Sequence, residues 1–103
     1  MLYTQQNQEP QNKQVLIVED DPVTRLLVEK VLHQFGYQTI SAKNGREGLS
    51  SFIENQPDII LMDVMMPAMD GYETVQAIRN YESGHSVPIL MLTSLEDGES
   101  IDI

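Results

Sequence analysis

The sequence contains no cysteine and no tryptophan, and these absences exclude several classes of protein. Without cysteine there is no disulfide scaffold, no thiol catalysis, and no zinc or iron–sulfur site built on thiolates. Only two phenylalanines and four tyrosines are present, so the core must consist mainly of aliphatic side chains. The 103 residues suffice for one domain and are too few for two sizeable hydrophobic cores.

Basic residues are also scarce, because six lysines and arginines stand against sixteen aspartates and glutamates, for a formal net charge of −10. A surface this negative repels phosphate backbones and anionic headgroups, so we expect no direct binding to nucleic acid or to a membrane. The apolar runs have the length of strands, and residues 1–13 lack the apolar centre of a signal peptide. We therefore expect a cytoplasmic protein.

Residues 1–13 are rich in glutamine and asparagine, so we expect a disordered lead-in followed by one domain over residues 14–103. In that domain apolar runs alternate with amphipathic stretches, which is typical of repeated βα units around a parallel sheet. Strands are expected at residues 15–18, 37–42, 58–62 and 89–92. A helix is expected after each of the first three strands, and the third helix should span about residues 72–81.

The first helix is expected to begin at Pro22 and to stop at Gly36. Its apolar residues recur at helical spacing, and we expect them on an inward stripe that packs against the sheet. These residues are Val23, Leu26, Leu27 and Val31.

Polar residues end three of the expected strands: an acidic run at residues 19–21, Asp63, and a hydroxyl pair at residues 93–94. The carboxyl ends of parallel strands meet at one edge of the sheet, and sites form where the strand order reverses. Neighbouring carboxylates repel each other by roughly 1 to 4 kcal/mol per pair, a cost that a divalent cation removes. Hard oxygen ligands with no histidine or cysteine nearby favour Mg²⁺ or Mn²⁺.

Single residues of this group also have ordinary structural explanations. An acidic run before a helix commonly complements the helix dipole, and Asp21 is expected in that role. Asp63 alone could cap a loop, but its coincidence with the other strand ends favours a site. His33 and His85 have no evident partner in the sequence, so both are expected to be surface residues.

Four stretches resemble the receiver domain of two-component response regulators: VLIVEDDPVTR, NGREGL, PDIILMDVMMPAMDGYE and VPILMLTS. The segment Asp-x-x-Met-Pro-x-Met-Asp-Gly is highly specific, and the matches span nearly all of residues 14–94. The resemblance implies a flavodoxin-like, doubly wound parallel sheet. It also implies that Asp63 takes a phosphoryl group from a phosphohistidine of a sensor histidine kinase or phosphotransfer protein, and that an output domain receives the signal.

By the same resemblance, Glu19 and Asp20 hold Mg²⁺ together with the phosphoacceptor itself and the main-chain carbonyl of Met65. Thr93 corresponds to the switch hydroxyl that bonds the phosphoryl oxygen, and the small Ser94 leaves room beside it. Such a domain is a signalling switch with self-catalysed phosphorylation, and it is not a metabolic enzyme.

The sequence departs from the family beyond the fourth strand. A receiver has a fifth strand, a fifth helix and an essential lysine, whereas the lysines here stand only at positions 13, 30 and 43. We therefore expect the first four-fifths of a receiver, which self-associates through the exposed edge of its fourth strand. Two alternatives stay open. One is a non-phosphorylated docking module or inactive fragment, and the other is a haloacid-dehalogenase-type phosphohydrolase, which needs a second acid where this sequence has Met65.

Overall fold

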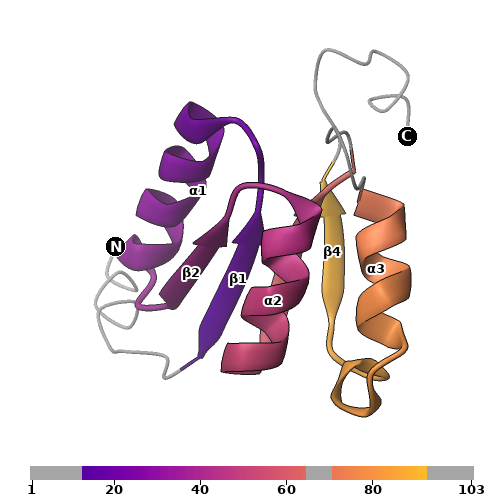
Figure 1. Cartoon of the computed structure of the whole chain (residues 1–103). Coiled ribbons are helices and arrows are strands. Elements are labelled where there is room, and N and C mark those ends of the chain that lie inside the picture. The colour runs from indigo at the N-terminus through magenta and orange to yellow at the C-terminus, as the bar shows by residue number, and fades with distance from the viewer. Residues whose placement is uncertain (1–12, 65–70, 93–103) are drawn as a thin grey trace, which may run out of the picture.

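A computed structural model of the chain describes residues 13–64 and 71–92 and shows a parallel sheet flanked by helices (Figure 1). This architecture confirms the predicted α/β, flavodoxin-like fold. Its elements are, in chain order, β1 (Gln14–Val18), α1 (Pro22–Gln34), β2 (Gln38–Ala42), α2 (Gly45–Asn55), β3 (Ile59–Asp63), α3 (Gly71–Arg79), the 3-10 turn η2 (Glu82–Gly84) and β4 (Ile89–Leu92).

The third helix ends at Arg79, two residues before the predicted boundary, because a turn follows it at once. The Tyr81 amide donates to the Ile78 carbonyl at 3.0 Å, and the side chain of Arg79 reaches into the next segment. There its Nη1 donates to the carbonyl oxygens of Gly84, at 2.8 Å, and of Val87, at 2.7 Å.

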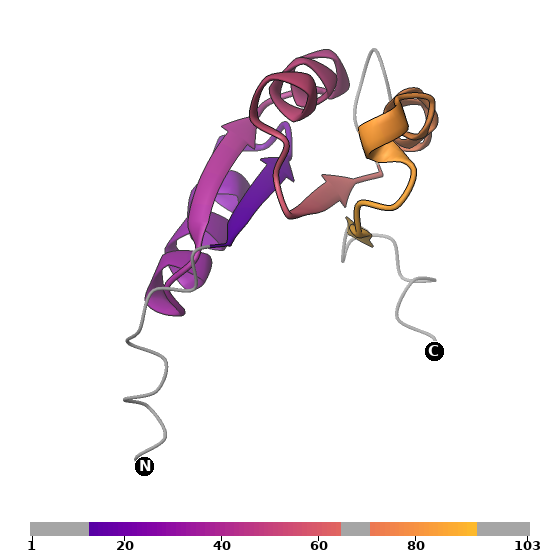
Figure 2. The same cartoon turned by 90° about the horizontal axis from the view of Figure 1, so that it is seen from below.

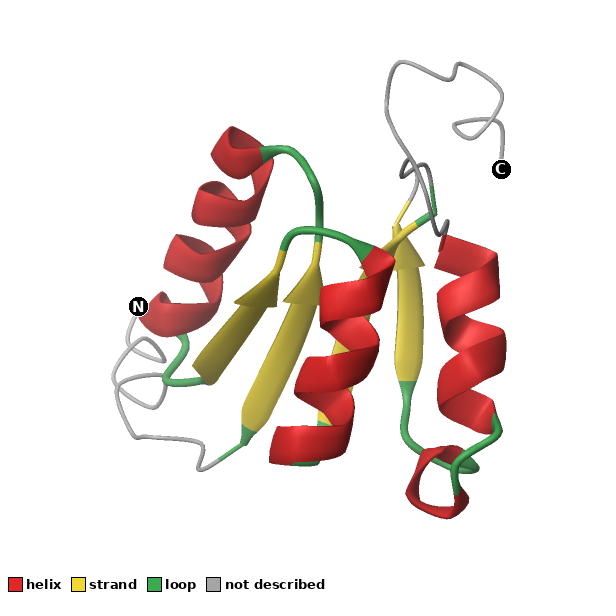
Figure 3. Cartoon of the chain, in the orientation of Figure 1, coloured by secondary structure: helices red, strands yellow, loops and turns green. Residues whose placement is uncertain are grey.

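The strands lie in the order β2-β1-β3-β4, and all three pairs are parallel (Figure 3). The chain therefore moves outward from β1 to one side for β2 and to the other side for β3. This reversal of direction falls between the carboxyl ends of β1 and β3, where Val18 is in register with Met62. A doubly wound sheet offers its crevice for a ligand at this place.

The hydrophobic core lies between the sheet and the layer formed by α2 and α3, which cover the same face (Figure 2). Gly48 brings α2 close to β1, since a Cβ at that position would lie 2.8 Å from Cγ2 of Val18. The fully buried side chains of this core include Leu16, Val18, Phe52, Ile60, Met62 and Ile78.

Helix α1 alone covers the opposite face among the described residues, and it packs on β1 and β2 (Figure 2). The prediction that its apolar stripe is buried is wrong, because none of its residues is buried. The four stripe residues, Val23, Leu26, Leu27 and Val31, are 51 to 64% exposed. The helix contacts only one half of the sheet face, so much of its apolar surface has no cover within the described part of the chain.

The described ranges contain no helix that is long and apolar enough to cross a membrane. The longest one, α1, has 13 residues and carries charged side chains. The expected lead-in, apart from its last residue Lys13, lies outside the described residues.

Candidate phosphoacceptor site

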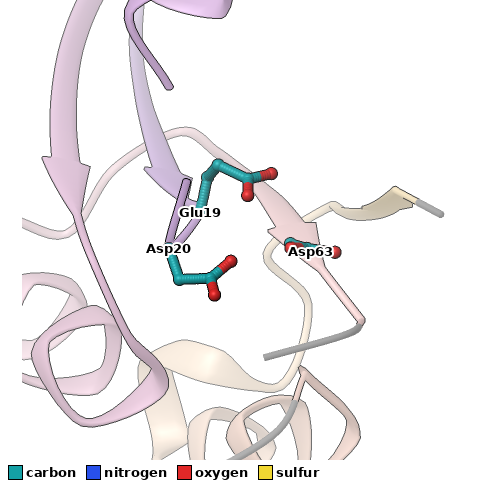
Figure 4. A group of neighbouring side chains, drawn as sticks. All are labelled: Glu19, Asp20 and Asp63. Carbon is teal, nitrogen blue, oxygen red and sulfur yellow. The ribbon is translucent and has the colours of Figure 1, made fainter. Parts of the chain in front are cut away.

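Three acidic side chains meet at the carboxyl ends of the two central strands (Figure 4). Glu19 and Asp20 directly follow β1, and Asp63 is the last residue of β3. Each residue contributes one carboxylate oxygen, and these three oxygens all lie within 4.8 Å of one another. The structure thus brings together three of the six residues predicted for the site, while Met65, Thr93 and Ser94 lie outside the described residues.

Glu19 is held in place at three points. Its amide donates to the Ala42 carbonyl at 3.0 Å, and its carboxylate accepts from the Asp21 amide at 3.1 Å. Its own carbonyl accepts a bond from Nη1 of Arg25 at 2.8 Å. The residue is only 6% exposed, so the chain keeps a carboxylate in a fixed and nearly dry position.

Burial raises the pKa of the Glu19 carboxyl to about 7, and the negative charge of Asp63 adds to the rise. The hydrogen bond from the Asp21 amide acts against this rise, because it stabilises the ionised form. A carboxyl group whose pKa is raised in this way gains strongly from a nearby cation. A cation bound beside Glu19 would therefore counteract the rise in its pKa.

Asp63 is 8% exposed, and the main chain around it is closely packed. The Val64 amide donates to the Leu92 carbonyl at 3.1 Å, which fixes the end of β3 against β4. Helix α3 begins at Gly71, where a Cβ would approach the Asp63 carbonyl oxygen to 2.5 Å. Only glycine permits this contact, so Gly71 sets how closely α3 approaches the carboxylate-bearing strand end. The sequence interpretation did not single out this role.

Asp21 has a different task from its two acidic neighbours, as predicted. It is the N-cap of α1, and its Oδ2 accepts from the Thr24 amide at 2.9 Å and from the Thr24 hydroxyl at 2.6 Å. The bond from the hydroxyl, followed by the bond from the amide, lowers the pKa of Asp21. Its carboxylate is therefore engaged in the helix end and does not belong to the cluster of three.

Both histidines are exposed, as expected. His33 nevertheless has a partner in the folded chain, because its Nε2 lies 2.8 Å from the hydroxyl oxygen of Thr39. This contact joins α1 to β2 and lies in the fold rather than among the three acids. Sequence spacing does not reveal it, since the two residues belong to different elements.

The three carboxylates fit a small divalent cation. Oxygen ligands of an octahedral Mg²⁺ lie about 2.1 Å from the metal, and hence about 3 Å apart when adjacent and about 4.2 Å apart when opposite. The oxygens of Glu19, Asp20 and Asp63 are gathered on nearly this scale before any cation is considered. Their hard donor atoms also suit Mg²⁺ rather than a softer metal.

The family model for the response regulator receiver domain matches residues 15–102. The chain therefore belongs to the response regulator receiver domain family, which confirms the prediction made from its motifs. Domains of this family are signalling domains with a phosphoacceptor role, so the docking-module and phosphohydrolase alternatives are not favoured.

The chain is similar to transcriptional regulators. It is 41% identical over 85 residues to "Probable transcriptional regulator ycf27" of Guillardia theta, and the match covers 82% of this chain and 32% of the relative. It is 40% identical over 85 residues to the transcriptional regulatory protein PcoR of Escherichia coli, covering 82% and 37%. The chain thus spans about a third of the length of these curated relatives.

A solved structure with the same fold is the receiver domain of sensor histidine kinase PA1611 from Pseudomonas aeruginosa. The TM-score is 0.78 at 34% sequence identity, and the match covers 85% of this chain and 74% of that one. That structure holds a magnesium ion coordinated in its active site cleft.

Proposed function

We propose that this chain is a phosphoacceptor domain in which Asp63 takes a phosphoryl group from a phosphohistidine of a sensor histidine kinase or phosphotransfer protein. The observation that carries the proposal is the gathering of the Asp63 carboxylate with those of Glu19 and Asp20 at the switch point of the sheet. Mg²⁺ is the proposed cofactor. It is supported by the donor set and by the magnesium in the similar PA1611 receiver.

In the proposed reaction a carboxylate oxygen of Asp63 attacks the phosphorus atom. The new O–P bond forms as the P–N bond breaks, and the imidazole nitrogen keeps the electron pair and takes up a proton. Mg²⁺, when bound, supplies positive charge to the equatorial phosphoryl oxygens. The product is an acyl phosphate, which is labile and therefore suits a signal of limited duration.

Three further roles rest on the family resemblance, because the residues lie outside the described part of the chain. We propose that the Met65 carbonyl is an additional metal ligand, that Thr93 is the switch hydroxyl, and that Ser94 leaves space beside the phosphoryl group. Phosphorylation itself is proposed to be self-catalysed, so a small acyl phosphate can replace the protein donor.

The proposed partners are a phosphohistidine protein and an output domain. The curated relatives are transcriptional regulators, which supports an output that acts on transcription. The net charge of −10 supports leaving direct nucleic-acid contact to another domain. A cytoplasmic location belongs to the same proposal.

Self-association through β4 is a further part of the proposed partner set. Within the described residues β4 pairs only with β3, and Leu90 on this strand is 54% exposed. An open strand edge with an apolar side chain favours pairing with a second copy of the chain. Sedimentation over a concentration series tests this, and a monomer at every concentration would refute it.

Labelling with acetyl phosphate and Mg²⁺, read by mass spectrometry, tests the main proposal. We expect one acyl phosphate, on Asp63, and none in Asp63→Asn. Asp58→Asn is the matched control, since Asp58 precedes the same strand and its Oδ2 accepts a bond from the Gln14 amide at 2.8 Å. This control should label as the unaltered chain does, and labelling that survives in Asp63→Asn would overturn the assignment.

A further inference from the structure

Arg25 lies in the first part of α1, and its side chain reaches back to the end of β1. Its Nη1 donates to the main-chain carbonyl of Glu19 at 2.8 Å, and the residue is half-buried. The bond spans the turn that carries Glu19 and Asp20. It therefore connects the first helix to the acidic pair without using either carboxylate.

This choice of acceptor has a chemical consequence. A guanidinium group on a carboxylate would occupy the oxygens that a cation needs. Directed at the carbonyl of Glu19 instead, Arg25 fixes the main chain and leaves those oxygens available. With the bonds from the Glu19 amide to Ala42 and from the Asp21 amide to the Glu19 carboxylate, it completes the three-point attachment of this residue.

We infer that Arg25 is a positioning residue for metal binding, which holds the Glu19 main chain so that the acidic pair is formed before the cation arrives. The inference rests on the proposed function, because it concerns Mg²⁺ at the same site. Residues that orient metal ligands from outside the coordination shell commonly change metal affinity 10- to 100-fold when removed. Arg25 is such a residue, because it contacts the main chain of the proposed ligand Glu19 and not the metal itself.

The charge of Arg25 acts in the opposite direction to its hydrogen bond. A nearby positive charge disfavours a second cation, so loss of charge alone would tighten Mg²⁺ binding. The carboxylate of Asp21 attracts Arg25 and offsets part of this charge. We therefore expect the positioning effect to be larger, and removal of Arg25 to weaken binding.

Isothermal titration of the full chain with Mg²⁺ tests this inference. We expect Arg25→Met to raise the Kd about tenfold and Arg25→Lys, which keeps a charged donor, to recover most of the affinity. Arg79→Met is the matched control, because Arg79 also donates Nη1 to main-chain carbonyls and lies in another part of the fold. It loses the same charge and should leave the Kd within about twofold of the original value.

Thermal melting of the metal-free variants separates positioning from general stability. Both arginine variants are expected to melt at lower temperature, but only Arg25→Met should also lose Mg²⁺ affinity. If it does not fold, Arg25→Gln replaces it, with a helix-compatible side chain too short to reach the Glu19 carbonyl. An unchanged or lower Kd in the folded Arg25 variant, or an equal rise in Arg79→Met, would overturn the inference. An unaltered chain that neither binds Mg²⁺ nor labels on Asp63 would instead refute the proposed function.

Discussion

The stability of the metal-free chain should depend on pH through Glu19. The folded pKa of this carboxyl is raised from 4.5 to about 7. Between these values the folded state binds more protons than the unfolded state, so the free energy of unfolding falls as the pH rises. The loss begins above pH 4.5 and is complete somewhat above pH 7. The full shift corresponds to about 3 kcal/mol, and solvent screening lowers the expected loss to between about 1 and 3 kcal/mol.

Glu19→Gln removes this dependence while keeping the shape of the side chain. The amide oxygen of glutamine can still accept the bond from the Asp21 amide, but the side chain cannot ionise. At pH 8 the variant should therefore be more stable than the original chain by about 1 to 3 kcal/mol, and near pH 4.5 the two should be equal. Urea unfolding followed by far-ultraviolet circular dichroism, in the presence of a chelator, measures both differences.

Magnesium should reverse the effect at high pH. At a hundred times its Kd, Mg²⁺ should stabilise the folded chain by about 2.7 kcal/mol, and this gain should be much smaller in Glu19→Gln. Asp58→Asn removes one charge far from the cluster and should keep the original pH profile. If Glu19→Gln and the original chain differ by the same amount at pH 4.5 and pH 8, burial of Glu19 does not control the profile and the reasoning fails.

Three other substitutions test the site and the core. Asp20→Ala should abolish the rise in melting temperature caused by Mg²⁺, and an unchanged rise would remove this residue from the site. Gly71→Ala places a Cβ 2.5 Å from the Asp63 carbonyl oxygen. It should destabilise the chain by about 1 to 3 kcal/mol and slow the labelling of Asp63 by acetyl phosphate. Unaltered labelling kinetics would contradict this prediction. Phe52→Ala removes a side chain that is 1% exposed and should cost about 3 to 5 kcal/mol in urea unfolding, whereas a cost below about 1 kcal/mol would show that the core refills.

The strands and the acidic cluster could be predicted because their signals are local. Apolar runs predicted three of the strands and the alternating residues 37–42 predicted the other, and the structure has strands at all four predicted places. Once a parallel sheet is expected, the acids at the carboxyl ends of β1 and β3 must share an edge of the sheet. Glu19, Asp20 and Asp63 were predicted from that rule and lie together.

The exposure of α1 and the contact of Arg25 with Glu19 could not be predicted in this way. Periodicity shows which side of a helix is apolar, but not how much of that side another element covers, so Leu26 was expected inside and is 52% exposed. The bond from Arg25 to Glu19 depends on a side chain that folds back across a turn. Its six-residue spacing matches no common helix or strand pattern.

The unequal attachment of the two acids that follow β1 has a consequence for the proposed metal site and for the ion that it would prefer. Glu19 is fixed through its amide, its carbonyl and its carboxylate, whereas Asp20 is the less buried of the two. Ca²⁺ requires six to eight oxygens at about 2.3 to 2.6 Å and a flexible arrangement, while Mg²⁺ requires six at about 2.1 Å in a regular octahedron. A ligand that cannot move outward penalises the larger ion. At the proposed metal site the turn after β1 would therefore favour the smaller ion, because the main chain and the carboxylate of Glu19 are held at three points.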